Sequence, residues 1–348
     1  MIQREGRPIN PPDQPASAPP SARRRSRSFL LRLGFGVVSL VILFALLNPM
    51  EIVNDLGQAN GRYVAAGFGV CLLGLACRTY KWKRILKRMD IHVSFWRLFE
   101  VYTISYWFST FLPGSLGGDV YKIYDVARAT DKKIRPALAV VIERLTGVLS
   151  LLTVTTIALL VYGRDLPLPA WLMPLLIGGA VAATVALLSG LLFFEPIWKS
   201  VNRIIPWTAG LIQAEKVGQF GEVSRELRGN RRLFIEAVAL GIGVQLLVLL
   251  AYYLMARAVS PGVSVHFFFT LYPLVEIASM IPISINGMGV REGLTVYAMQ
   301  VYAVSPSLAM SMGILFRLVA LALGLLGGIL LLMRRSGGWK VAGGQPAV

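Results

Sequence analysis

The chain has 348 residues, of which 55% are hydrophobic and only 15% charged, and its mean hydropathy is +0.62. Because soluble domains carry about 25% charged residues, this composition excludes an ordinary water-soluble domain and predicts a membrane protein. The formal net charge is +17. The basic residues fall between apolar segments, as they do in membrane proteins, so we expect no nucleic-acid partner.

Residues 1–28 are rich in Pro, Ser and Arg. Such a segment cannot bury enough apolar surface to fold, so we predict a disordered basic tail. An apolar segment follows at once, without a good small-residue cleavage site after it. We therefore interpret that segment as a retained anchor and not as a cleaved signal peptide.

Six segments are long and apolar enough to cross about 30 Å of hydrocarbon. The predicted transmembrane helices are 29–47, 61–77, 137–161, 171–194, 233–256 and 307–333. Together they predict a polytopic, all-α fold with a single integral membrane domain over 29–335.

The distribution of Lys and Arg predicts the orientation of these helices. Five polar stretches hold 28 of the 35 basic residues: 1–28, 78–97, 120–135, 195–232 and 334–348. The positive-inside rule places them in the cytoplasm. We therefore expect both termini there, including a tail over 336–348, and a cytoplasmic segment at 195–232.

Two further apolar segments, 98–119 and 264–300, do not fit this topology as simple spans. The polar stretches before and after each segment are predicted to lie on the same side of the membrane, so each segment has to enter the membrane and return. Each also contains a Gly- and Pro-rich turn, at 112–119 and at 282–289. We predict two re-entrant hairpins, because non-helical backbone at that depth has to be buried in protein or line a wet cavity.

The second half of the chain repeats the first at an offset of 173 residues, with every direction reversed. The offset aligns Arg144 with Arg317, Gly114 with Gly287, and the acidic Asp119 with Glu292. We predict an inverted repeat with halves at about 29–162 and 171–333. Such repeats with broken helices are typical of transporters, whose binding site lies near the bilayer midplane.

The predicted site follows from charges placed inside apolar segments. One arginine at the centre of a bilayer costs about 2.5–3.5 kcal/mol, and a repeated cost suggests a function. Guanidinium groups suit phosphate, and backbone N–H groups at helix starts bind anions. The candidate substrate-binding residues are Arg144, Arg317, Arg291, Gly114, Gly117, Gly118, Asn286, Gly287 and Gly289.

Four carboxylates accompany these arginines: Asp119, Glu143, Glu276 and Glu292. They either carry a coupling proton or neutralise the arginines as internal ion pairs, and both roles are compatible. Neither the two histidines nor Cys71 and Cys77 have ligand-spaced partners, so we expect no metal site. The glycine turns lack the context of a nucleotide-binding loop, so we expect no cofactor. The basic, aromatic-rich stretch 78–97 predicts contact with an anionic lipid surface.

The chain resembles the membrane region of lysylphosphatidylglycerol synthases and the free-standing flippase-like proteins that share it. The resemblance covers about 30–335 and is carried by the segments 111–119, 143–147 and 282–293. It implies an integral protein of the bacterial inner membrane. In two-part synthases of that family, the membrane region is associated with moving an aminoacylated lipid between leaflets, and a separate soluble domain makes the lipid. The present chain ends 15 residues after its last predicted span, so we expect no lipid aminoacylation by it.

The primary hypothesis is a translocase that moves an anionic or phosphate-bearing lipid head group across the midplane. A second hypothesis is a membrane-embedded transferase acting on a phospholipid or lipid-linked sugar, with Asp119 or Glu292 as the base. A third is a non-catalytic partner of a lipid-modifying enzyme.

Overall fold

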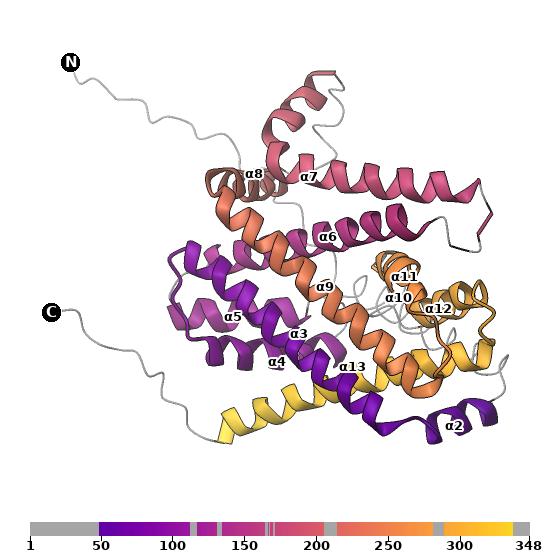
Figure 1. Ribbon diagram of the computed structural model, residues 1–348. Coiled ribbons are helices and arrows are strands. Elements are labelled where there is room, and N and C mark those ends of the chain that lie inside the picture. Colours follow the sequence, from indigo (N-terminus) through magenta and orange to yellow (C-terminus); the bar gives the residue numbers. More distant parts are fainter. Residues whose placement is uncertain are drawn as a thin grey trace, which may run out of the picture.

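The computed structural model describes residues 49–111, 117–130, 134–163, 166, 168–169, 171–204, 214–280 and 289–336. Throughout these ranges the regular structure is helical and contains no strand. The helices (Figure 1) are α2 (Pro49–Gly57), α3 (Gly61–Arg88), α4 (Phe95–Phe111), α5 (Gly117–Thr130), α6 (Ile134–Tyr162), α7 (Leu172–Ile204), α8 (Ala214–Gly229), α9 (Arg231–Val259), α10 (Val265–Thr270), α11 (Tyr272–Ser279), α12 (Val290–Gln300) and α13 (Pro306–Ser336).

Five of these helices are long and apolar enough to cross a membrane: α3, α6, α7 up to Phe193, α9 and α13. They coincide with five of the six predicted transmembrane segments, and the all-α membrane fold is confirmed. The predicted span 29–47 lies outside the described residues. Helix α7 changes direction at Phe193, whose φ of −125° and ψ of 29° are not helical.

Helix α3 continues through Arg88, where the sequence predicted a transmembrane segment ending at residue 77. The extension is helical because it packs inside the protein: Trp82, Ile85 and Leu86 are fully buried. The basic stretch therefore turns its apolar face to the helix bundle. Of its basic residues, Lys87 and Arg88 near the end are exposed, and a lipid-surface role for them stays a prediction.

Each segment predicted as a re-entrant hairpin contains short helices. Helix α4 occupies the first segment, 98–119, and contacts α5, which begins near its end at Gly117 and continues to Thr130 through the polar stretch that follows. Helices α10, α11 and α12 occupy the second segment. The connecting residues 112–116 and 281–288 lie outside the described residues. The described bounds therefore fit the predicted breaks in the helices without testing the path of the turns.

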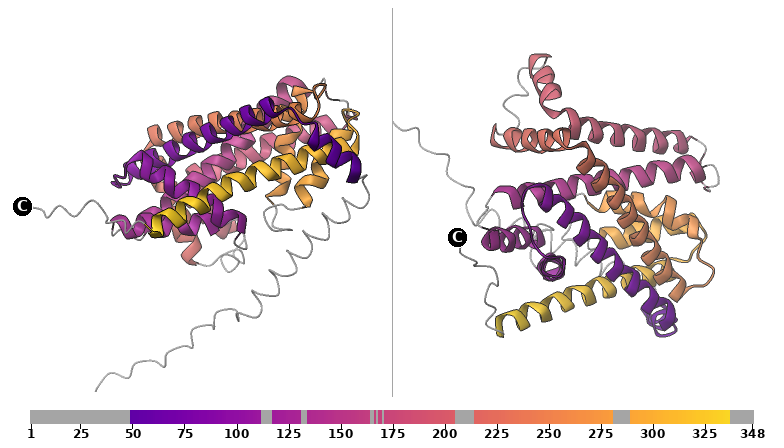
Figure 2. Two further views of the ribbon diagram at one scale, coloured as in Figure 1. Left: turned by 90° about the horizontal axis from the view of Figure 1, so that it is seen from below. Right: turned by 60° about the vertical axis from the view of Figure 1, so that its left-hand side comes forward.

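Helices α3 and α9 form the centre of the molecule and run side by side (Figures 1 and 2). Glycines allow the close approach: a Cβ at Gly67 of α3 would lie 3.0 Å from the Met255 side chain of α9, and one at Gly241 of α9 would lie 3.3 Å from Lys81 Nζ of α3. In Figure 1, α4 and α5 lie to one side of this pair, and α10 to α12 lie to the other.

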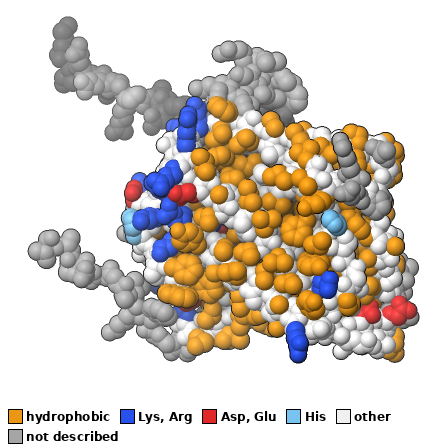
Figure 3. Space-filling view, viewed as in Figure 1, with side chains coloured by type: hydrophobic (Ala, Val, Ile, Leu, Met, Phe, Trp, Pro, Cys, Tyr) orange, Lys and Arg blue, Asp and Glu red, His pale blue; other side chains and the backbone are white. Residues whose placement is uncertain are grey.

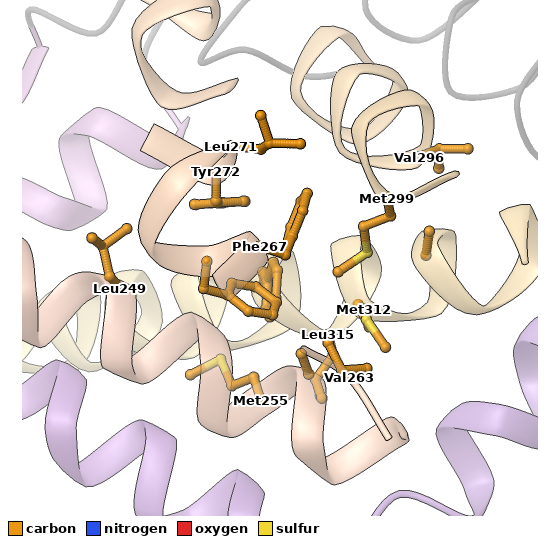
Figure 4. Close-up of a cluster of buried hydrophobic side chains, with 14 of the residues drawn as sticks. Leu249, Met255, Val263, Phe267, Leu271, Tyr272, Val296, Met299, Met312 and Leu315 are labelled. Carbon is orange, nitrogen blue, oxygen red and sulfur yellow. The ribbon is translucent and has the colours of Figure 1, made fainter. Parts of the chain in front are cut away.

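Two apolar cores flank the central helices. One combines α3, α4 and α6 with parts of α5, α8 and α9. The other, shown in Figure 4, joins α9 to the short helices and α13 through Leu249, Phe267, Tyr272, Met299 and Leu315. These cores hold the short helices, which are too short to be stable alone.

The surface is divided by residue type. Figure 3 shows a broad apolar band across the helices and a concentration of Lys and Arg at one edge. Many large apolar side chains face outward, among them Trp171, Leu175 and Leu332, each more than 60% exposed. This pattern suits a protein whose surrounding medium is lipid.

Helix α13 packs against α4 through glycines. A Cβ at Gly327 would lie 2.2 Å from the Thr103 carbonyl oxygen, which belongs to helix backbone and cannot rotate away. We expect Gly327→Ala to destabilise the protein by roughly 1–3 kcal/mol, as overpacking does. The measurement is the Tm of the purified protein in detergent. Gly178→Ala on α7 is the control, since no atom lies within 4 Å of its Cβ position; an equal loss in both variants would contradict the packing argument.

Candidate functional site

The predicted site residues of the first half, Arg144 and Asp119, contact each other. Arg144 of α6 forms an ion pair with Asp119 in the first turn of α5. Lys122, one turn further along α5, bridges Asp119 Oδ1 at 3.1 Å and Glu143 Oε2 at 3.0 Å. The side chain of Arg144 is still 44% exposed, so its guanidinium is not enclosed by the protein.

Glu143 and Lys122 are the most enclosed members of this group, with side chains 8% and 4% exposed. The Glu143 side chain accepts a hydrogen bond from the Tyr102 hydroxyl at 2.6 Å, and Lys81 Nζ donates to the Glu143 backbone carbonyl at 3.2 Å. Lys122 Nζ also lies 4.4 Å from the centre of the Tyr102 ring, a cation–π distance. Glu143, Lys122 and Lys81 are all at least nine-tenths buried. Four helices (α3, α4, α5 and α6) thus meet at one charged network.

The second half contains the matching pair. Arg317 of α13 donates from Nε to Glu292 Oε1 at 3.1 Å. The other carboxylate oxygen of Glu292 accepts the N–H of Gly289 at 2.8 Å and so caps α12. Gly289 has φ of 78°, a conformation that glycine adopts without strain. The helix start, the buried acid and the arginine therefore form one unit.

Arg291 belongs to a neighbouring pair. Its Nη2 lies 3.2 Å from Glu276 Oε1 on α11, and its Nη1 donates to the Tyr252 hydroxyl of α9 at 3.3 Å. Arg291 also interacts electrostatically with Glu292, the ion-pair partner of Arg317.

Arg78 of α3 connects the two halves. It interacts electrostatically with Tyr106, Tyr102 and Glu143 on one side, and with Glu276 on the other. Arg78 lies ten residues before the end of α3, roughly 15 Å along the helix. Arg78 and the ion-paired residues described above form one group, which we call the charged core. Its members are Arg78, Lys81, Asp119, Lys122, Glu143, Arg144, Glu276, Arg291, Glu292 and Arg317.

The structure brings together the seven charged residues that the sequence singled out. The predicted internal ion pairs are present at Asp119, Glu276 and Glu292, whereas Glu143 pairs with Lys122 and not with an arginine. Gly118 packs on α4, since its Cβ position lies 2.4 Å from the Ser105 carbonyl oxygen. Gly117 begins α5. Gly114, Asn286 and Gly287 lie outside the described residues, and anion binding by these glycine turns stays a prediction.

Sequence reasoning missed four members of the site: Arg78, Lys81, Tyr102 and Lys122. The first two were assigned to a basic surface stretch, and Lys122 to a cytoplasmic loop. A helical signal was available, because Arg78, Lys81, Trp82 and Ile85 recur at spacings of three and four and so share one face of α3. On that face, Lys81, Trp82 and Ile85 are buried and Arg78 is partly buried.

A second network closes the basic edge of the molecule. Arg334 near the end of α13 reaches Asp125 of α5 at 2.6 Å and donates to the Tyr121 hydroxyl at 2.8 Å. Arg97 of α4 also contacts Asp125, at 3.1 Å, and Glu100, at 3.5 Å. These contacts connect α13 with α4 and α5.

Within the described ranges, no group of three or more His, Cys, Asp or Glu residues is placed to hold a metal ion.

Comparison with known proteins places the chain in a family. The family model described as "Lysylphosphatidylglycerol synthase TM region" matches residues 29–328. The chain belongs to this family. It is also similar to a protein named "UPF0104 membrane protein" from Methanothermobacter thermautotrophicus. The two are 22% identical over 308 residues, which cover 82% of this chain and 89% of the relative. This family member is therefore a multi-pass membrane protein whose charges converge inside the bundle.

Proposed function

We propose that the protein is a lipid translocase of the flippase type, which moves an anionic, phosphate-bearing head group across the bilayer midplane. The observation that carries the proposal is the charged core, in which Arg144 and Arg317 are joined through Arg78. Charged side chains inside membrane proteins are costly and typically mark a substrate or ion pathway. The lipid tails would stay in the bilayer while the head group follows these cations.

An inverted repeat would let one site serve both leaflets. Helices α5 and α12 begin at Gly117 and Val290, which are 173 residues apart. The two ion pairs keep the same offset, since Asp119 corresponds to Glu292 and Arg144 to Arg317. Equivalent pairs at equivalent helix starts support an architecture of two mirrored halves with re-entrant hairpins, in which the halves move about a shared site.

The proposed orientation follows from the surface. The exposed basic residues gather at one edge (Figure 3), where α3 ends at Arg88 and α13 reaches Arg334. The positive-inside rule favours the cytoplasm for this edge, with both termini on that side. We propose the bacterial inner membrane as the location of the protein.

The ion pairs give a route for exchange. A phosphate that enters the site can replace Asp119 on Arg144 or Glu292 on Arg317, because it accepts bidentate hydrogen bonds from guanidinium. A displaced carboxylate surrounded by protein is then stabilised by taking up a proton. Protonation of Asp119, Glu143 or Glu292 would thus couple lipid movement to a proton gradient.

Reconstitution in vesicles tests this function. Fluorescent phosphatidic acid or fluorescent phosphatidylglycerol is placed in both leaflets, and dithionite quenches only the label that reaches the outer leaflet. We expect the wild type to expose the inner-leaflet label, and Arg144→Ala or Arg317→Ala to slow the exchange at least tenfold. Arg62→Gln is the control, since this exposed arginine lies at the far end of α3 from Arg88.

Equal rates for the wild type, Arg144→Ala and protein-free vesicles would reject the translocase. Mass spectrometry of the same vesicles examines the transferase alternative, which predicts a modified lipid that disappears with Asp119→Asn.

A further inference from the structure

The charged core contains more cations than carboxylates. Its six cationic side chains are Arg78, Lys81, Lys122, Arg144, Arg291 and Arg317, and its four carboxylates are Asp119, Glu143, Glu276 and Glu292. Two positive charges are therefore in excess. The sequence of the connecting segments 112–116 and 281–288 contains no Asp, Glu, Lys or Arg, so these segments leave the balance unchanged.

Neighbouring charges do not supply the missing anions. The network at the basic edge is balanced in itself, with Arg97 and Arg334 facing Glu100 and Asp125. On the other side, Asp55 of α2 accepts a hydrogen bond from Ser311 at 2.9 Å. The excess therefore stays with the charged core.

The excess is located on α3, at Lys81 and Arg78. The Lys81 side chain is only 4% exposed, and in the described part of the chain its Nζ bonds only to a backbone carbonyl, at 3.2 Å. Arg78, which is partly buried, also has no direct ion pair among the described residues, and it interacts electrostatically with Glu143 and Glu276. Buried cations without a carboxylate partner are costly, and an anionic ligand removes that cost.

We propose that the charged core binds a lipid head group carrying two negative charges, a phosphomonoester or a diphosphate, with Arg78 and Lys81 as its principal ligands. This inference rests on the proposed function and names its substrate class. A phosphodiester carries one charge and would leave one cation uncompensated. A phosphomonoester carries about −1.5 to −2 at pH 7 and offers three acceptor oxygens.

The geometry of α3 suits such a ligand. Arg78 and Lys81 are three residues apart and therefore neighbours on one face of the helix. Arg78 interacts electrostatically with both Glu143 of α6 and Glu276 of α11. Its planar guanidinium binds two phosphate oxygens, and the Lys81 ammonium supplies a point charge.

Binding measurements on the purified full-length protein test the inference. The probes are dioctanoyl phosphatidic acid, a phosphomonoester, dioctanoyl phosphatidylglycerol, a phosphodiester, and inorganic phosphate. We expect phosphatidic acid to bind at least tenfold more tightly than phosphatidylglycerol at pH 7.5. The ratio should shrink at pH 5, where the monoester carries a single charge because its second pKa is about 6.

Two variants locate the site. Arg78→Gln and Lys81→Met should each weaken phosphatidic acid at least tenfold and phosphatidylglycerol by much less, whereas Arg62→Gln should change neither. Lys81→Met should also raise the Tm of the lipid-free protein, because it removes an uncompensated buried charge. If Lys81 had a purely structural role, the Lys81→Met substitution would lower the Tm instead.

Equal affinity for the two lipids, or unchanged affinity in Arg78→Gln and Lys81→Met, would overturn the inference. Binding of inorganic phosphate as tight as that of phosphatidic acid would overturn the assignment to a lipid. Translocation of phosphatidylglycerol that depends on Arg144 but is indifferent to Arg78 would refute this substrate class and leave the translocase standing. Tight phosphatidic acid binding without movement of either lipid would refute the translocase and leave the site standing.

Discussion

Replacing Glu143 by Ala is expected to destabilise the protein by about 3–5 kcal/mol, the usual cost of removing one partner of a buried ion pair. The Glu143 carboxylate pairs with Lys122 at 3.0 Å and accepts the Tyr102 hydroxyl at 2.6 Å. Without it, Lys122 keeps only Asp119, which it shares with Arg144. Lys81 and Arg78 lose their nearest counter-charge as well. The measurement is the unfolding midpoint in detergent, together with the yield of folded protein.

A surface carboxylate provides the matched comparison. Glu236 of α9 pairs with Arg84 at 2.7 Å and with Arg232 at 3.3 Å, but its side chain is 24% exposed. Solvent-accessible pairs contribute about 0–1 kcal/mol, so Glu236→Ala should cost far less than Glu143→Ala. Tyr102→Phe removes one hydrogen bond to a charged acceptor and should fall between them, at about 1.5–3 kcal/mol. Equal losses at positions 143 and 236 would show that the charged core does not depend on Glu143.

The second large effect is expected at Arg317. Arg317→Glu would place two carboxylates together where Glu292 is 3% exposed, in a site that now holds an ion pair. We expect a loss of folded protein, since like charges in a buried site are strongly destabilising. The exchange variant, with Arg317→Glu and Glu292→Arg combined, restores opposite charges. It should recover most of the folded yield, and a double-mutant cycle measures the coupling between the two positions.

The exchange variant also separates structure from function. Arginine at position 292 cannot accept the Gly289 N–H, so the start of α12 loses its cap. The guanidinium also moves from α13 to α12. We therefore expect a folded protein whose lipid translocation stays at least tenfold below that of the wild type. Full recovery of translocation would mean that Arg317 serves only as a structural ion pair.

Much of the fold was accessible from the sequence, because lipid imposes a simple rule on length and polarity. The five described transmembrane helices were predicted from apolar runs of about 20 residues. The sequence prediction ended the transmembrane part of α3 too early, because a hydropathy scale scores Lys81 and Arg84 as residues that face water. Only the packed structure reveals that Trp82, Ile85 and Leu86 are enclosed by other helices.

The candidate site was predicted in part, and for a physical reason. Charges inside apolar runs are conspicuous, so Arg144, Arg317 and their acids could be found from sequence alone. The partner of each charge could not, since it depends on how helices distant in sequence meet. Glu143 pairs with Lys122 through the contact of α6 with α5. Arg78 joins the halves only because α3 occupies the centre of the bundle.

The most direct test of the account is a cryo-electron microscopy map of the protein in nanodiscs that contain phosphatidic acid and phosphatidylglycerol. The account predicts density for a lipid phosphate within hydrogen-bond distance of Arg78 and Lys81, inside the helix bundle, and the loss of that density in Arg78→Gln. A map in which lipid phosphates occupy only the two membrane surfaces, while the charged core is closed on itself, would contradict it.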